Sequence, residues 1–222
     1  MLVLMEGPLA TSTPDDARLG LIAAAQALGH RVHVIPPAGS LADAEPSLAR
    51  GDFQWGVLFG KGFDPARYQQ LHDDARALNV TLLNDPTQHA NAAAFDRTVL
   101  EGLTACTPPV PLRRMERPGG PALSREYRLF VLDADVLAMG PSSSEDPFGA
   151  LTERDERELR ALAHEAARRT RVPWLTADVG QLENGDWRLL ETADPACSEL
   201  AAVNPRDLLG ALANGLEQRA GC

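Results

Sequence analysis

Four short apolar runs in the first part of the chain are separated by longer stretches of mixed polarity. The runs predict β-strands at residues 2–5, 31–35, 51–59 and 80–83. Thr13-Pro14 and Asp64-Pro65 each place proline after an N-cap side chain, which is the pattern of a helix start. These two helices are predicted to end near residues 28 and 78. Because strands alternate with helices, we expect a parallel sheet with right-handed crossovers.

In the second half, strands follow one another more directly. Asn84-Asp85-Pro86 starts a third helix, predicted to reach about Gly102. Residues 104–124 contain five prolines and two glycines, so we place the boundary between a domain 1–103 and a domain 104–222 at this segment. A short strand is expected at 110–115. Residues 126–132 and 136–139 then predict a hairpin that turns at Asp133-Ala134-Asp135.

Two more helices are expected in this half. Thr152 and Asp155 approximate a capping box that starts a long charged helix reaching about Arg171. Asn204-Pro205 starts a terminal helix. The predicted fold class is therefore α/β, with an α+β C-terminal half built from antiparallel hairpins and helices.

A second hairpin is predicted within 172–200. Asn184-Gly185 suits a two-residue type I′ turn, in which both residues take positive φ. With that turn Leu182 faces Trp187, Gly180 faces Leu189, and Asp178 faces Glu191. Opposed like charges are destabilising unless they are compensated, and a hard divalent cation such as Mg²⁺ compensates two carboxylates. We therefore predict a metal site here, unless the register is shifted by one residue or the two acids lie on a solvent face.

Composition narrows the classes of partner. The formal net charge of −10 argues against nucleic acid, because phosphate binding needs a basic face. No apolar run approaches the roughly 20 residues that span a bilayer, and the three cysteines have neither metal nor disulfide spacing. We expect a cytoplasmic protein with no membrane partner. Gly60-Lys61-Gly62 contains the only lysine and lacks the rest of a P-loop.

Four segments, taken in order, resemble the ATP-grasp superfamily, in particular its small amidoligase-type branch. The segments are Asn84-Asp85-Pro86 with Asp96-Arg97, the strand 126–133 with Arg128, the strand 172–179 with Asp178, and 189–194 with Glu191 and Asp194. The N-terminal α/β unit is similar to the Rossmann-like domain that precedes the ATP-grasp domain in such proteins. Order and spacing carry the resemblance, which covers most of the chain.

The resemblance implies a ligase that uses ATP and Mg²⁺. It implies that Asp178 and Glu191 hold Mg²⁺, that Asp194 completes the metal and nucleotide site, and that Arg128 stabilises the γ-phosphate. Carboxylate-held Mg²⁺ and an arginine suit phosphoryl transfer, which needs electrostatic neutralisation more than covalent help. The simpler alternative for Arg128 is a surface pair with Glu126 or Asp133, worth about 0 to 1 kcal/mol.

Two departures from the family pattern concern the phosphate clamp. The 28 residues between Arg97 and Glu126 contain no lysine and are short for the usual lid strands. Arg113 and Arg114 are the candidate replacements for the lid lysines, because arginine binds phosphate bidentately; Arg117 and Arg125 are the other nearby cations. Where the family has a glycine after Ser198, this chain has Glu199.

These observations leave three hypotheses. The first is an ATP-dependent carboxylate-amine ligase that acts on small-molecule carboxylate and amine substrates, such as an amino acid or small peptide, with a partner chain or second copy covering the shortened lid. The second is a degenerate, non-catalytic ATP-grasp-like protein that binds nucleotide weakly or serves as a scaffold. The third, a metal-dependent hydrolase, lacks an identifiable general base. The five histidines have no ligand spacing, and Cys197 has no evident base.

Overall fold

The computed structural model describes residues 1–6, 16–36, 39–41, 53–60, 63–94, 96, 98–104, 114–117, 120–143 and 148–220, with 114–117 and 120–124 described by their backbone. The chain folds into two compact units. Unit 1 comprises Met1–Ala90, Asp194–Glu199 and Pro205–Cys222, and unit 2 comprises Asn91–Ala193 and Leu200–Asn204. The segment 104–124, where we predicted a domain boundary, lies inside unit 2, and the terminal helix belongs to unit 1. No helix in the described part of the chain is both long and apolar enough to cross a membrane.

Unit 1 is built on the predicted parallel sheet. Its strands are β1 (Leu2–Glu6), β2 (Arg31–Ile35), β3 (Gln54–Phe59) and β4 (Val80–Leu82), in the spatial order β2-β1-β3-β4. All three pairings are parallel, so the expectation is confirmed. Its helices are α1 (Asp16–Ala27), α2 (Pro65–Ala77) and α5 (Pro205–Ala220), with η2 (Pro195–Cys197) as a single 3₁₀ turn; α3 (Pro86–Ala94) begins in unit 1.

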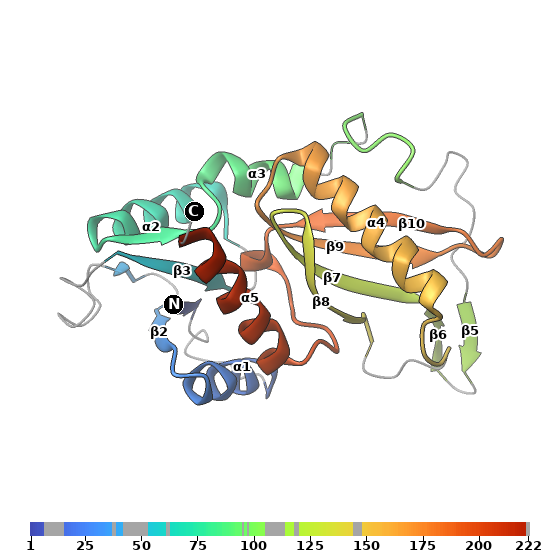
Figure 1. Cartoon of the computed structure of the whole chain (residues 1–222), viewed down its shortest axis with the longest axis horizontal. Coiled ribbons are helices and arrows are strands. Elements are labelled where there is room, and N and C mark those ends of the chain that lie inside the picture. Colours follow the sequence, from blue (N-terminus) through green and yellow to red (C-terminus); the bar gives the residue numbers. More distant parts are fainter. Residues whose placement is uncertain are drawn as a thin grey trace. The chain divides into compact units, whose positions relative to one another are not determined.

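Helices cover both faces of this sheet. Leu2, Leu4 and Leu58 pack in one core cluster with Tyr68 and Leu71 of α2. Successive strand residues point to opposite faces, so their buried neighbours face the other way. There α1 and α5 lie side by side (Figure 1). The near-continuous apolar strands of the sequence therefore reflect a sheet that is buried on both sides.

Unit 2 contains an antiparallel sheet with the order β10-β9-β7-β8. Its strands are β7 (Glu126–Leu132), β8 (Asp135–Pro141), β9 (Trp174–Gln181) and β10 (Trp187–Ala193). Helix α4 (Glu153–Thr170) packs across one face, as Figure 1 shows. The predicted capping box is present, because the Thr152 side chain accepts from the Asp155 amide and the Asp155 side chain accepts from the Thr152 amide.

A separate two-stranded sheet precedes this one. It consists of β5 (Arg114–Arg117) and β6 (Gly120–Ser124), which pair antiparallel. The prediction that the segment before Glu126 is too short for lid strands is therefore wrong. Glycine and proline crowd the segment, and those residues hid the strand period. The remainder of the strand predicted at 110–115, residues 110–113, lies outside the described residues, and the third helix ends at Ala94 rather than near Gly102.

The turn between β9 and β10 differs from the prediction. Gly185 has φ +91°, but Asn184 does not have positive φ, so the turn is not type I′. The Leu182 amide donates to Asp186 O (2.8 Å) and the Gly185 amide to Leu182 O (2.9 Å), which makes a three-residue loop. The Asn184 side-chain oxygen accepts from the Asp186 amide, an Asx turn that satisfies the loop locally.

The register changes accordingly. Trp187 pairs with Gln181 and Leu189 with Val179, one residue away from the predicted partners. A β-bulge at Leu190 then restores the register, and Glu191 pairs with Asp178 as predicted. Positive φ at two adjacent turn residues, the signature of type I′, occurs instead at Asp133 (+50°) and Ala134 (+73°), between β7 and β8.

Candidate active site

Three of the predicted site residues form one row across the sheet of unit 2. Arg128 of β7 pairs with Asp178 of β9, and Asp178 pairs with Glu191 of β10. On the other side, Arg128 pairs with Gly140 of β8. Their neighbours in sequence, such as Leu129, are in the core cluster beneath α4. Because side chains alternate along a strand, the row lies on the face opposite α4.

Arg128 and Asp178 form a bidentate ion pair. Arg128 Nε donates to Asp178 Oδ1 at 2.7 Å, and Arg128 Nη2 donates to Asp178 Oδ2 at 2.6 Å. The two side chains are 20% and 16% exposed, so the pair is largely shielded from water. Parallel N–H···O bonds of this kind are short, directional and stronger than bonds between neutral groups. Arg128 is therefore held in place by a partner 50 residues away, whereas the simpler alternative had placed its partner close to it in sequence.

Glu191 is exposed at the end of the row. Across from it, the sheet is capped by close backbone packing rather than by another charge. A Cβ placed on Gly140 would lie 3.0 Å from the Ala202 carbonyl carbon and the Val203 nitrogen. Glycine at this position therefore lets the chain at 202–203 pass directly over β8. The reactive part of the row is the Arg128, Asp178 and Glu191 side chains.

The row fits a metal that is delivered with a nucleotide better than a resident metal. In the described part of the chain, no group of three or more His, Cys, Asp or Glu side chains could hold a metal ion. Mg²⁺ ordinarily uses one or two protein carboxylates and completes its octahedron with phosphate oxygens and water. Two adjacent carboxylates beside an arginine match that smaller requirement. This donor set gives no support to an all-protein metal centre, which the hydrolase hypothesis would need.

Asp194 has a different environment, within unit 1. Its carboxylate is 2% exposed and accepts three hydrogen bonds, from Asn84 Nδ2 (2.8 Å) and His89 Nδ1 (3.0 Å) at Oδ2, and from the Ala196 amide (2.8 Å) at Oδ1. The last of these caps the 3₁₀ turn η2. The structure therefore gives Asp194 a set of protein donors, and it is not a member of the row in unit 2. Its role at a metal or nucleotide stays a prediction.

Sequence analysis missed His89. This side chain is buried, stacks on Tyr68 with ring centroids 3.8 Å apart, and lies 3.4 Å from Phe63 O through Nε2. The Tyr68 hydroxyl donates to Asn84 O at 3.1 Å. Burial, and next the charge of Asp194, raise the pKa of Tyr68. The only local signal was the helix start at residues 84–86, which places Asn84 and His89 on either side of the first helical turn of α3.

The predicted lid cations fall in the least described part of the chain. Arg113 lies outside the described residues, as does Lys61, and Arg114 begins β5 with only its backbone described. Arg125 is buried and engaged elsewhere. Its Nη1 donates to Gln181 Oε1 at 2.9 Å, its Nη2 lies 3.7 Å from Asp155 Oδ2, and its guanidinium lies 5.3 Å from the centroid of the Trp187 ring.

Solved structures share this arrangement of elements. A RimK-domain ATP-grasp protein from Sphaerobacter thermophilus is 16% identical, with a TM-score of 0.55 over 96% of this chain and 98% of its own. The ATP-grasp ligase PsnB, in a complex with minimal precursor, Mg and ADP, is 12% identical with a TM-score of 0.58 over 98% of each chain. The D-cycloserine synthetase DcsG is 12% identical with a TM-score of 0.58 over 97% of this chain and 100% of its own. No curated protein sequence matches the chain.

A parallel α/β unit, a two-stranded hairpin, and an antiparallel sheet that carries an arginine and two acids in one row define an ATP-grasp protein. This class consists of ATP-dependent ligases. Residues 86–212, more than half of the chain, match the model of an ATP-grasp domain family, the third of its clade, and the chain belongs to that family.

Proposed function

We propose that the protein is an ATP-dependent carboxylate-amine ligase that acts on an amino acid or small peptide. The observation that carries the proposal is the row of Arg128, Asp178 and Glu191 on the face of the sheet opposite α4. Two proteins of similar structure support it. PsnB is a ligase that was solved with a precursor peptide, and DcsG is a synthetase whose product, D-cycloserine, is a small molecule.

In this proposal Asp178 and Glu191 hold Mg²⁺ through their carboxylate oxygens. Mg²⁺-bound ATP supplies the phosphoryl group that activates the substrate carboxylate before the amine attacks. Arg128 neutralises the negative charge of the terminal phosphate, which is the main contribution a protein makes to phosphoryl transfer. Arg113 and Arg114 take the place of lid lysines, and Asp194 supports the site.

The bidentate pair gives Arg128 a defined resting position. With no cation present, Arg128 neutralises Asp178, and the single uncompensated charge of the row is that of Glu191. A cation held by the two carboxylates would compete for the same oxygens, so Arg128 would become available to an anion. The row therefore couples occupation by a cation to release of the arginine.

The same pair also supports a second candidate, a scaffold that has lost catalysis. A closed Arg128–Asp178 pair neutralises itself and needs neither metal nor nucleotide. In that case the ion pair holds β7 and β9 together, and Glu199 adds a charge that disfavours phosphate.

Calorimetric titration with ATP, in the presence and absence of Mg²⁺, separates the two. The test variant carries Asp178→Asn and Glu191→Gln, and the matched control carries Glu183→Gln and Asp186→Asn, two acids of the loop of the same hairpin. We expect Mg²⁺-dependent binding that the test variant loses by more than about 100-fold, because even outer-shell partners of a metal site are worth 10- to 100-fold. The control should bind as the wild type does.

Amino acids and short peptides are then screened for stimulated release of ADP from the wild type. Absence of ATP binding at millimolar concentration in the folded protein, or equal binding by the test and control variants, would refute the ligase proposal.

A further inference from the structure

Unit 1 contains a cavity that the proposed ligase chemistry does not use. It has a volume of about 260 Å³ and lies where β2 and β3 begin, against the last turns of α5. Its lining includes His30, Phe53, Gln54, Trp55, Leu216 and Glu217. In an open α/β sheet, ligands usually bind at the carboxyl ends of the strands. A cavity at the amino ends is therefore a separate feature of this unit.

Three buried nitrogen atoms of the lining have no hydrogen-bond partner among the described residues. They are His30 Nε2, Gln54 Nε2 and Trp55 Nε1. More than nine in ten buried polar groups in native proteins are paired, so three unpaired nitrogens on one cavity require an explanation. Tryptophan Nε1 and the glutamine amide nitrogen are donors only. Two of the three therefore need an acceptor.

The orientation of the Gln54 amide is determined by its other end. Arg31 Nη2 donates to Gln54 Oε1, so the carbonyl oxygen faces the guanidinium and the NH₂ group faces away from it. Burial lowers the pKa of His30 below its ordinary value of 6.5, which keeps the ring neutral at neutral pH. A neutral imidazole presents either a donor or an acceptor at Nε2, depending on its tautomer.

The charges and the walls of the cavity define the other half of its chemistry. Arg31 is bonded to Gln54, and the Arg219 guanidinium lies 5.5 Å from the centroid of the Trp55 ring, so two cations stand beside one lining acid, Glu217. Phe53 is 56% exposed and packs edge-on against Trp55, with centroids 5.4 Å apart. An aromatic ring left exposed beside a cavity offers a surface for an apolar ligand.

We propose that this cavity binds a small carboxylate with an apolar or aromatic body. The body packs on Phe53, Trp55 and Leu216, and the carboxylate accepts hydrogen bonds from Trp55 Nε1 and Gln54 Nε2 after small rotations of those side chains. A carboxylate has two oxygens with about four acceptor positions, which is enough for all three nitrogens. Charge-assisted bonds of this kind are stronger than those to a neutral carbonyl. The site is made of residues other than those of the row, so it stands independently of the ligase proposal.

The test is titration of the ¹⁵N-labelled protein with 3-phenylpropionate, followed at the indole N–H signals. The Trp55 signal is identified by its loss in Trp55→Phe. Two probes with the same aromatic body serve as comparisons, the neutral 3-phenylpropanamide and the cationic 3-phenylpropylamine. We expect the carboxylate to shift the Trp55 signal in a saturable way, the amide to bind about tenfold more weakly, and the amine not to bind.

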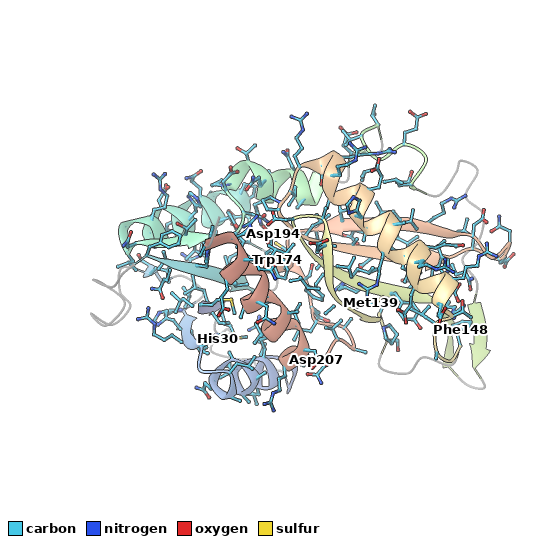
Figure 2. All side chains as sticks on the ribbon, in the orientation of Figure 1. His30, Met139, Phe148, Trp174, Asp194 and Asp207 are labelled. Atoms are coloured by element: carbon cyan, nitrogen blue, oxygen red, sulfur yellow. The ribbon has the colours of Figure 1, made fainter. Side chains whose placement is uncertain are left out.

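Variants then test each contribution. Gln54→Glu keeps an acceptor for Arg31 but replaces the donor by a negative charge, so it should weaken 3-phenylpropionate binding by about tenfold or more. Glu217→Gln removes the lining acid and should strengthen binding a few-fold. The matched control is Asp207→Asn, an exposed acid in the first turn of the same helix α5, which should bind as the wild type does; Figure 2 labels Asp207 and His30.

Three results would overturn the proposal. They are no shift of the Trp55 signal at 10 mM probe (about the limit of weak binding), equal affinity for the carboxylate and the amide, and unchanged affinity in Gln54→Glu. Trp55→Phe is used for assignment, so the conclusion does not depend on the folding of that variant. ATP titration of the same samples reports on the row separately, so failure here and failure of the ligase proposal are distinguishable.

Discussion

Replacing Asp194 by alanine would test whether this carboxylate supports the fold of unit 1 or is chiefly a ligand. The change removes the acceptor of three donors, Asn84 Nδ2 and the Ala196 amide at 2.8 Å and His89 Nδ1 at 3.0 Å. A buried donor left unpaired costs about 1–3 kcal/mol, and the three losses overlap in one network. We therefore expect Asp194→Ala to lower the free energy of unfolding by about 3–5 kcal/mol, a large fraction of the roughly 5–15 kcal/mol that is typical of a domain.

Asp194→Asn should be much milder. The asparagine oxygen can still accept from the Ala196 amide, and its NH₂ group can donate to an unprotonated Nδ1 of His89. The His89 proton then moves to Nε2, which already lies 3.4 Å from Phe63 O. The chief loss is the bond to Asn84, so we expect a cost of about 1–2 kcal/mol.

Urea unfolding followed by circular dichroism, in EDTA and again in Mg²⁺, measures both costs. Asp73→Ala, which removes a carboxylate that is 60% exposed on α2, is the control and should change stability by less than about 0.5 kcal/mol. A residue that serves only as a metal ligand would cost little in EDTA, and its removal could even stabilise the protein, because its charge is then uncompensated. A cost for Asp194→Ala below about 1 kcal/mol in EDTA would therefore refute the structural reasoning.

Three further changes test local features of unit 2 by urea unfolding. Ala134→Gly should stabilise by up to about 1 kcal/mol, because Ala134 has φ +73° and glycine adopts that conformation without steric cost; a loss of stability would contradict this. Gly140→Ala should cost about 1–3 kcal/mol, because the added Cβ meets the Ala202 backbone at 3.0 Å; a neutral effect would show that the chain moves aside freely. Burial raises the pKa of Asp155, but hydrogen bonds, first that from Trp187 Nε1 (2.9 Å), outweigh burial and leave the pKa below 3.8. A lowered pKa gives stability that is present above the unfolded value and is lost as the pH falls through the folded value, so Trp187→Phe should show a smaller decrease in unfolding midpoint between about pH 5 and 3 than the wild type. An equal decrease would contradict that assignment.

Helix starts and single strands could be predicted from the sequence because their causes are local. Asp64 accepts from the Arg67 amide three residues on, and Thr152 and Asp155 bond reciprocally within one turn. The strand at 126–132 was predicted at its observed bounds because its alternation of buried and part-buried residues is visible in sequence. The family resemblance likewise rested on the order of segments, and the family match over residues 86–212 confirms it.

The register of the second hairpin shows where local reasoning stops. The Asn-Gly pair predicted a type I′ turn, but an Asx turn by the Asn184 side chain and a longer loop were the more favourable solution. Asp178 still faces Glu191 because the bulge at Leu190 offsets the shift in the loop. A bulge follows from how a strand packs on its neighbours, so no pattern within the hairpin indicated it.

The sequence by itself therefore determined the elements, the parallel order of the first sheet, and which acids and arginine were worth following. Only the tertiary structure decided what each of them touches. Arg128 and Asp178 are 50 residues apart, and Asp194 bonds to Asn84 across 110 residues, so neither contact has a period or spacing in the sequence. The cavity beside Trp55 likewise combines the starts of strands with the end of the last helix. Periodicity reports the face on which a residue lies, whereas its partner depends on chain crossings that are not encoded in any short segment.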